Sequence, residues 1–252
     1  MLTTTRKKAL IPIREYYFSD HPAKSAPLEL VTFFIQAKTP IHGFRPFTSR
    51  IIQLQQGTSQ LAQALSKSTR YKIKRAERNG VSPVYDRSPD PSALRKFKAF
   101  FDAFARGKGI AHCSLSKLES LARQNALFIS HALNPNGSPI VAHAYVVDQS
   151  IGRARLLYSA SHFRSMGDTQ QRNGIGMANR LLHWSDILFC KNEGLATYDL
   201  GGVSPNSQDP EKRAIARFKL EFGGTELTEF TGCISKSPLM QRLISTLQRS
   251  VA

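Results

Sequence analysis

Cysteine is scarce in this sequence, and so are patterns that bind metal ions. The three cysteines, Cys113, Cys190 and Cys233, lie far apart and form no C-x-x-C pair. This spacing predicts reduced thiols in a cytoplasmic protein and argues against a disulfide framework or a zinc site. The seven histidines follow no H-E-x-x-H or similar spacing. We therefore expect no metal site.

Long apolar runs are also missing. The strongest run near the N-terminus spans residues 30–35, whereas a membrane-crossing helix needs about 20 residues. Residues 1–18 are basic but lack the apolar core of a signal peptide. We therefore expect a cytoplasmic protein, and peripheral contact with the anionic inner face of the membrane stays open.

Acidic residues are few: 18 Asp and Glu stand against 35 Lys and Arg, for a formal charge of +17. A field of this sign attracts nucleic acid, anionic lipid or a phosphorylated cofactor. The plain alternative is a basic surface that serves solubility, because net charge indicates partners only loosely. Hydrophobic residues make up 41% of the 252-residue chain, which is enough for one large or two small folded domains.

Residues 87–91 (R-S-P-D-P) are the best candidate for a domain boundary, because closely spaced prolines interrupt regular structure. We predict an N-terminal partial lobe with a basic helix at residues 1–86 and a larger domain at residues 87–252. Within the first part, residues 28–37 favour a buried strand. Residues 57–79 favour one helix, which ends at Gly80.

The pattern of elements in the larger part predicts a mixed α/β (α+β) arrangement, in which an antiparallel meander is followed by a helix and a returning strand. Apolar residues spaced three and four apart predict helices before the meander, at residues 92–105 and 114–124. Ser114 is the predicted N-cap of the second helix. Alternating apolar residues and Gly-containing turns predict the strands of the meander at 126–133, 139–148 and 153–160. The same reasoning predicts a helix, a strand, a helix and a strand at 174–192, 195–200, 211–220 and 225–231.

A short glycine pattern opens the predicted helix at 174–192. Two glycines at a helix start let the backbone approach a ligand, and the free N–H groups there suit a pyrophosphate. The alternative is a glycine-containing turn into a core helix. The predicted cofactor-binding residues are Gln171, Arg172, Asn173, Gly174, Ile175 and Gly176.

The pattern Q-x-x-G-x-G at 171–176, after a strand and before a helix, resembles the acyl-CoA loop of the GNAT acyltransferase superfamily. In that superfamily the backbone amides of this loop hold the pyrophosphate of the cofactor. The resemblance therefore implies acyl-CoA as the donor substrate. In this chain residues 161–170 separate the predicted strand from the loop, where typical members have almost none.

Three other segments resemble the Fem family of peptidoglycan-bridge aminoacyltransferases and its short relatives. They are the Trp184 helix leading to Y-D-L-G-G at 198–202, the basic helix at 65–77, and I-A-R-F-K-L-E-F-G-G at 215–224. The resemblance implies a GNAT-like acyltransferase fold with a partial N-terminal GNAT-like lobe. Bridge-forming members typically carry two complete lobes, and residues 1–85 are too short for a complete one.

Four side chains are candidates for the chemistry. Attack of an amine on a thioester or ester needs a base for the proton and donors for the oxyanion. Asp199 ends a predicted strand, and Lys219 matches the Fem-family lysine associated with phosphate binding and developing negative charge. His143 and Tyr158 lie on strands of the meander. A structural role is the alternative for each, and the choice of base stays open.

The basic helix supplies candidate phosphate ligands. Arg70, Lys72 and Arg75 belong to a run of six cations that faces only Glu77. At 100° per residue these charges surround much of the helix, so some of them meet solvent or an anion. We predict that these three residues bind phosphate groups of a substrate, and a merely solvated face is the alternative.

These observations favour an N-acyltransferase that moves an acyl group from an acyl-CoA-type thioester to an amino group of a cell-envelope or sugar precursor, which would often carry phosphate. Direct transfer is expected, because no Ser-His-Asp or Cys-His order indicates a covalent nucleophile. The charge of +17 supports an alternative with aminoacyl-tRNA as donor and tRNA as partner. A non-catalytic anion-binding protein on the same scaffold is the third possibility.

Overall fold

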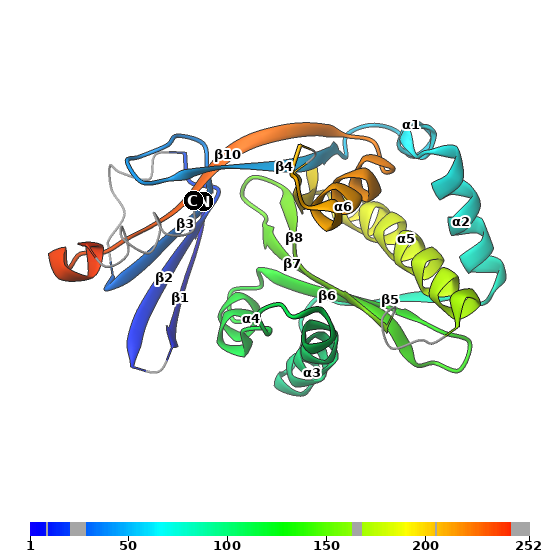
Figure 1. The fold of residues 1–252 in the computed structure, drawn as a ribbon, viewed down its shortest axis with the longest axis horizontal. Helices are drawn as coiled ribbons and strands as arrows, with labels where there is room; N and C mark the ends of the chain where they lie inside the picture. The colour runs from blue at the N-terminus through cyan, green and yellow to red at the C-terminus, as the bar shows by residue number, and fades with distance from the viewer. Residues whose placement is uncertain (9, 21–28, 163–167, 205, 243–252) are drawn as a thin grey trace. The chain divides into compact units, whose positions relative to one another are not determined.

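A computed structural model describes residues 1–8, 10–20, 29–162, 168–204 and 206–242 (Figure 1). The chain forms two compact units. One unit joins Met1–Ser49 with Glu226–Ala252, and the other is Arg50–Thr225. No helix in the described part of the chain combines the length and the hydrophobicity that a membrane crossing needs.

The unit that contains both ends of the chain is built from strands. Strand β1 pairs antiparallel with β2, β2 parallel with β3, and β3 antiparallel with β10. Tyr16 and Phe34 stack at a ring distance of 5.1 Å in its core. Its described strands are β1 (Leu2–Lys8), β2 (Ile11–Tyr17), β3 (Val31–Ala37) and most of β10 (Thr225–Ile234), and it includes the first half of β4 (Arg45–Gln53).

The larger unit contains the predicted meander. Strands β5, β6, β7 and β8 pair antiparallel in sequence order, and β9 pairs parallel with β8. The predicted mixed α+β class is confirmed. The strands of this unit are β5 (Ser82–Asp86), β6 (Leu127–Leu133), β7 (Pro139–Asp148), β8 (Arg153–Ser161) and β9 (Thr197–Gly202). The helices are α1 (Thr58–Ala64), α2 (Lys67–Arg78), α3 (Pro91–Lys108), α4 (Leu115–Ala122), α5 (Thr169–Asn192) and α6 (Pro210–Leu220).

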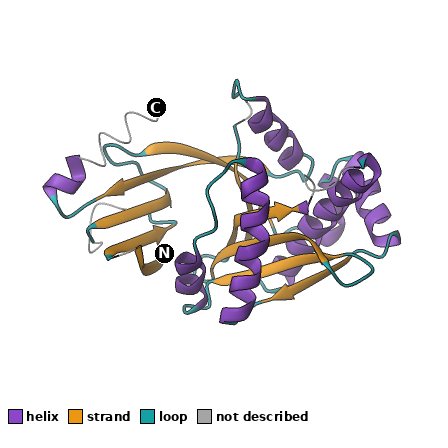
Figure 2. Cartoon of the chain, turned by 60° about the horizontal axis from the view of Figure 1, so that its bottom comes forward, coloured by secondary structure: helices purple, strands orange, loops and turns teal. Residues whose placement is uncertain are grey.

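Helices cover both faces of this sheet. Helix α5 packs on β6 and β7 and carries α2 on its outer side, whereas α3 and α4 pack on β8 and β6 from the other face (Figures 1 and 2). The core on the α5 side includes Phe128, Tyr145, Leu181 and Phe222, each at most 4% exposed. Burial of such side chains contributes about 1.5–3 kcal/mol each.

Helix boundaries follow local capping chemistry. Ser114 accepts a hydrogen bond from Lys117 N, which confirms the predicted N-cap of α4. The single helix predicted at 57–79 is wrong, because the chain breaks into α1 and α2. Leu65 is extended, and Ser66 accepts from Thr69 N and starts a new helix. A serine offers this capping bond only by leaving the helical conformation itself.

The compact units differ from the predicted division at residues 86 and 87. Helix α2 packs along α5, and β5 pairs with β6. Residues 50–86 therefore belong with the larger unit, although prolines interrupt the chain just after them. The returning strand β10 instead joins the N-terminal strands through β3. Both differences arise from pairing between residues far apart in sequence.

Gly224 is expected to be far less tolerant of a side chain than Gly137. Both adopt left-handed backbone, with φ of 74° and 78°. A Cβ on Gly224 would lie 2.3 Å from Ile51 O, whereas a Cβ on Gly137 would meet nothing within 4 Å. We expect Gly137→Ala to lower the free energy of unfolding by about 1–2 kcal/mol and Gly224→Ala by about 4 kcal/mol. Equal losses of the free energy of unfolding, measured by urea denaturation, would contradict the close approach of Gly224 to Ile51.

Candidate active site

Strands β8 and β9 separate soon after they pair. Residues 153–155 of β8 pair with 197–199 of β9, but β8 stays paired with β7 as far as Ser161. The β7–β8 register shifts between Ala144 and Tyr145, and such an irregularity bends a strand. We call the point where the two parallel strands part, at Leu156 of β8 and Gly201 of β9, the notch.

Lys219 places its ammonium group at the notch. Its Nζ donates a hydrogen bond of 2.7 Å to Gly202 O. A Cβ on Gly201 would lie 3.6 Å from this Nζ and 3.5 Å from Leu156 O, so the ammonium group lies beside both strands. Burial lowers the pKa of Lys219 to about 8, with Asp199 opposing and Arg155 adding to the shift. The group therefore titrates near neutral pH.

Asp199 is held by two partners below the notch. Its Oδ2 accepts a bond of 2.6 Å from Arg153 Nη2, and its Oδ1 accepts one of 2.7 Å from Gly201 N. The carboxylate is fully buried. These bonds join β8 to β9 and fix the backbone at Gly201. The geometry supports a positioning role better than that of a base that meets solvent or substrate.

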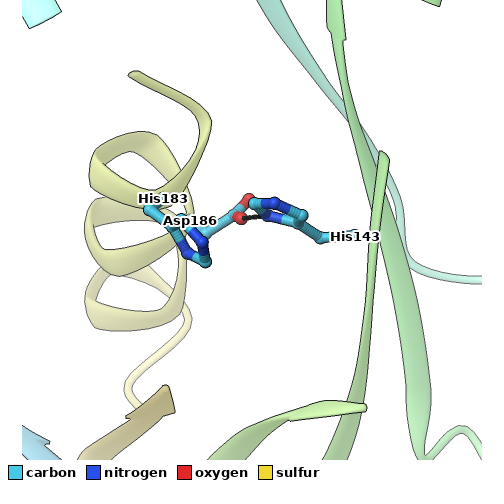
Figure 3. A group of neighbouring side chains, drawn as sticks. All are labelled: His143, His183 and Asp186. Atoms are coloured by element: carbon cyan, nitrogen blue, oxygen red, sulfur yellow. Dashed lines mark hydrogen bonds and ion pairs between the residues drawn. The ribbon is translucent and has the colours of Figure 1, made fainter. Parts of the chain in front are cut away.

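His143 belongs to a buried cluster on the α5 side of the sheet (Figure 3). Its Nδ1 lies 2.8 Å from Asp186 Oδ2, and its Nε2 lies 3.0 Å from Asn179 Oδ1. Tyr145 donates to the same Asp186 oxygen at 2.6 Å. The Tyr145 and Tyr198 hydroxyls are 2.6 Å apart, and Tyr198 is 2.9 Å from His183 Nδ1. Strand β7, helix α5 and strand β9 thus meet through side-chain hydrogen bonds.

The buried cluster keeps its neutral groups neutral. Burial raises the pKa of Tyr145 and Tyr198 well above the usual value, and the charge of Asp186 adds to both shifts. Burial lowers the pKa of His183 well below its usual value, and electrostatic interactions with His143, Lys219 and Arg180 lower it further. The two phenols therefore keep their protons, and the His183 imidazole is unprotonated at one nitrogen.

The same cluster has the spacing of hydrogen bonds and not of a metal site. The ligand atoms of His143, His183 and Asp186 lie within 4.8 Å of one another. Ligands at about 2.0–2.1 Å from a tetrahedral zinc ion would be about 3.3 Å apart. The 2.8 Å separation of His143 and Asp186 is instead a hydrogen-bond length. Direct hydrogen bonds account for this geometry better than coordination does.

A cationic groove runs between α2 and α5. Its volume is about 380 Å³. Arg180 is committed to a bidentate pair with Glu221, at 2.9 and 3.2 Å, and Thr69 also donates to Glu221 at 2.6 Å. This arrangement ties α2, α5 and the end of α6 together. The groove is lined by Tyr71, Lys72, Arg75, Arg172, Asn173, Gly176, Met177 and Arg180.

Comparison with solved structures identifies the architecture. FemX superimposes with a TM-score of 0.59 at 12% identity over 86% of this chain and 75% of its own. L-PGS from Bacillus licheniformis superimposes with a TM-score of 0.54 at 13% identity, over 87% of this chain and 73% of its own. A C-terminal domain named for lysylphosphatidylglycerol synthetase, from Agrobacterium fabrum, superimposes with a TM-score of 0.54 at 11% identity. The match covers 88% of this chain and 72% of that domain's chain. The chain has a Fem-like fold of the GNAT type. No family model and no curated protein matches the sequence.

The Fem-like fold here lacks the predicted glycine loop. Residues 171–176 lie inside α5, which begins at Thr169 with Asp168 as its N-cap. Asp168 accepts from the amides of Gln170 and Gln171. Only the first four amides of a helix lack an intrahelical partner, so those of Gly174 and Gly176 are already used. The predicted amide cradle is therefore wrong, and this segment contributes side chains to the groove instead.

The other predicted residues fall at separate places. Lys72 and Arg75 meet Arg172 and Asn173 in the groove. Arg70 lies apart, because its guanidinium donates to the carbonyls at the end of α1, Ala62 O and Gln63 O. Tyr158 faces α3: its hydroxyl accepts from Ser114 N at 3.2 Å, and its ring packs on Phe97 and Phe101. It does not join the buried cluster of His143.

The predicted site residues included neither Asp186 nor His183. The two are three positions apart on α5, so they share one helix face. A His and an Asp on the otherwise apolar face of a helix were the available signal, because buried polar groups are paired or functional. His143 on β7 was already a predicted candidate, whereas Tyr198 on β9 had no such signal.

Asp199→Asn is expected to destabilise the fold by about 3 kcal/mol, because it leaves the buried Arg153 without its counterion. The ion pair of Asp20 with Lys38 provides a matched control. Its N···O distance is also 2.6 Å, but its side chains are 64% and 65% exposed. Asp20→Asn should change the free energy of unfolding in urea by less than about 1 kcal/mol. A small loss in both variants would show that burial of the Asp199 pair has no energetic weight.

Proposed function

We propose that this protein is an N-acyltransferase that moves an acyl group from an acyl-CoA-type thioester directly to an amine. The observation that carries the proposal is the ammonium group of Lys219 at the notch, 2.7 Å from Gly202 O. An acyl group placed where β8 and β9 part would present its carbonyl oxygen to this cation. A positioned cation of this kind stabilises the oxyanion that forms when an amine attacks.

Direct transfer agrees with the rest of the site. The three cysteines are all buried, and burial raises the pKa of Cys113 to about 12 and of Cys233 to about 11. Thiols of this kind are poor nucleophiles because the thiolate is scarce. The amine of the acceptor is therefore the attacking group, and the thiolate of the donor leaves.

The cationic groove supports a phosphorylated substrate. Lys72 and Arg75 on α2 face Arg172 and Asn173 on α5 across a volume of about 380 Å³. This set of side chains suits the phosphates of CoA or of an amine-bearing acceptor. We favour an amino-sugar or cell-envelope precursor as acceptor, which the protein would meet in the cytoplasm or at the inner face of the membrane.

Aminoacyl-tRNA is the second candidate donor. The cations of α2 extend beyond the groove, since Lys74 and Arg78 are exposed on the same helix and do not line it. Together with a formal charge of +17, they would suit a long polyanion better than a small cofactor. A fold shared with FemX is compatible with either donor.

Thermal unfolding separates these donors. At a CoA concentration of about 100 Kd, binding to the native state should add about 2.7 kcal/mol, a rise in Tm of about 5–10 °C. Binding of tRNA should instead weaken steeply between 50 and 200 mM salt. Absence of any rise in Tm with CoA would exclude CoA as the donor. Absence of tRNA binding, or tRNA binding that does not change with salt, would exclude aminoacyl-tRNA.

Arg75→Ala and Lys74→Ala form a matched pair for this measurement. Both remove one exposed cation from α2, but only Arg75 lines the groove. We expect Arg75→Ala to weaken binding of the phosphorylated ligand by about tenfold, because it removes a charge-assisted hydrogen bond worth about 1.5 kcal/mol. Lys74→Ala should change affinity less than twofold. Equal effects would mean that net charge, and not the groove, binds the ligand.

Deprotonation of Lys219 should slow the reaction at alkaline pH. Its pKa is about 8, so the ammonium form declines as the pH rises through 8 and the rate should fall with it. Lys219→Met should lower kcat by about 100- to 1,000-fold and remove this decline. Lys219→Arg, which stays charged, should shift the decline to higher pH. A rate that rises through pH 8 in the wild type would instead identify Lys219 as a base.

A further inference from the structure

Gly176 is a glycine that the fold does not require. It lies inside α5, where a glycine is less favourable than an alanine, and its backbone is not left-handed. A Cβ at this position would meet only Arg180 Nη1 among the described residues, at 3.9 Å. Neither backbone strain nor packing therefore explains the missing side chain. Gly176 does line the cationic groove, and a glycine lets a ligand approach the backbone closely.

The missing side chain leaves part of α5 uncovered. Arg172, Gly176 and Arg180 are spaced four apart, so they form one row on the helix surface. Arg180 closes one end of the row, because its Nη1 donates to Gly176 O at 3.0 Å and its Nε and Nη2 bind Glu221. Arg172 lines the groove at the other end. We call the surface at Gly176, between the two arginines, the bare strip.

The opposite wall of the groove, on α2, carries an aromatic ring and two cations. Tyr71 and Arg75 are four residues apart and share a helix face, and Lys72 lines the groove beside them. Tyr71 is 56% exposed, and its side chain makes no hydrogen bond or ring contact with the described residues. A single exposed aromatic ring is ordinary on a protein surface. This one lines the same groove as the bare strip, so one ligand can contact both.

Helices α2 and α5 run in opposite directions. Thr69, near the start of α2, donates to Glu221 at 2.6 Å, and Arg180 binds the same carboxylate. Val81, just after the end of α2, packs against the core cluster that contains Ile175. The start of α2 therefore lies at the level of Arg180, and its end lies toward the start of α5 (Figure 1).

This orientation gives the groove an aromatic end and a cationic end. Tyr71 is two residues beyond Thr69, so it lies within one helical turn of the level of Gly176. Arg75 lies one turn further along, toward Arg172. A turn rises about 5.4 Å, which is comparable to the separation of the base and the phosphates in a nucleotide. A planar ring on Tyr71 thus covers the bare strip, while phosphates one turn away meet the cations.

We propose that the cationic groove binds a nucleoside diphosphate. Its base lies between Tyr71 and the bare strip, and its phosphates lie on Lys72, Arg75 and Arg172. The inference rests on the proposed function, because it names the class of phosphorylated substrate that the groove takes. A sugar phosphate without a base would leave Tyr71 and the bare strip without a role. The volume of about 380 Å³ is within the usual range for small-ligand sites.

Two substrates of the proposed reaction can bring this group. A CoA-type donor carries an adenosine diphosphate portion, and a nucleotide-activated amino sugar would bring a uridine diphosphate portion as the acceptor. Calorimetric titration of the wild-type protein at low salt with ADP, UDP and inorganic pyrophosphate distinguishes them. Pyrophosphate has the phosphates and no base, so it measures the cations alone.

We expect the preferred nucleotide to bind about 5- to 150-fold more tightly than pyrophosphate, because stacking on an aromatic ring supplies that increment. A preference for ADP identifies the donor as the ligand of the groove, and a preference for UDP identifies the acceptor. Pyrophosphate that binds as tightly as both nucleotides overturns the proposal, and so does an absence of nucleotide binding.

Substitutions of Tyr71 test the stacking itself. Tyr71→Ala should weaken the preferred nucleotide by about 5- to 150-fold and leave pyrophosphate binding unchanged. Tyr71→Phe keeps the ring and should match the wild type. Neither variant should lower Tm, since the side chain is exposed. An equal loss of nucleotide binding in both variants, or an equal loss of pyrophosphate binding in Tyr71→Ala, would overturn the stacking.

The bare strip provides an independent test. Leucine favours a helix more than glycine does, so Gly176→Leu and the control Gly174→Leu should both keep or raise Tm. Only Gly176 lines the groove, and a Cβ on Gly174 would meet nothing within 4 Å. We expect Gly176→Leu to weaken the nucleotide by about tenfold or more, because its side chain fills the space of the base. Gly174→Leu should bind like the wild type. Equal affinities in the two variants would show that no base lies on the strip.

The two proposals can fail separately, because binding is measured without turnover. If the nucleotide binds through Tyr71 but no acyl group passes from acetyl-CoA or an aminoacyl-tRNA to an amine such as glucosamine 1-phosphate, the nucleotide site stands and the proposed function fails. If the wild type transfers acyl groups and both Tyr71→Ala and Gly176→Leu keep its kcat/KM, the proposed function stands and the nucleotide site is wrong.

Discussion

The buried ion pair of Arg153 and Asp199 is the interaction on which the rest of the site depends. It joins the parallel strands across 2.6 Å, from Arg153 at the first paired position of β8 to Asp199 at the last paired position of β9. The second oxygen of Asp199 holds Gly201 N, and Gly201 adopts a φ of 78° that favours glycine. The backbone therefore turns away from β8 at a fixed residue, and Lys219 reaches Gly202 O there.

Helix α5 carries two different sets of polar side chains because its faces differ. The face turned to the sheet carries His183 and Asp186 among apolar residues, and a buried polar group there must be paired. The face turned to α2 carries Arg172 and Asn173 at the groove. A helix repeats every 3.6 residues, so one helix can carry a buried hydrogen-bond network on one face and line a cationic groove with another.

The charge of the protein is used unevenly. Several cations are spent inside the fold: Arg153 pairs with Asp199, and Arg180 with Glu221. Arg180 also lines the groove, where Arg75 and Arg172 are exposed, and the net charge of +17 raises the local concentration of any anionic ligand. Lys219 lies at the notch instead, where burial lowers its pKa to about 8.

The sequence by itself determined the elements with strong local signals. The meander, the Ser114 cap, the Fem-like segments at 198–202 and 215–224, and the cations of α2 could all be predicted, because periodicity and capping are local properties. It also placed Lys219 among the candidates for the chemistry. These features depend on residues close together in the chain.

Only the tertiary structure decided how those elements meet. The start of α5 is the exception, because the Asp168 cap that made a helix of the predicted glycine loop is a local signal that the prediction overlooked. The buried cluster of His143 depends on the register of β7, β8 and β9 and on the rotation of α5 above them. Each of its members alone resembles an ordinary core residue. Hydrogen bonds between residues more than 40 positions apart, such as Tyr145 and Tyr198, follow from packing, and no local pattern encodes them.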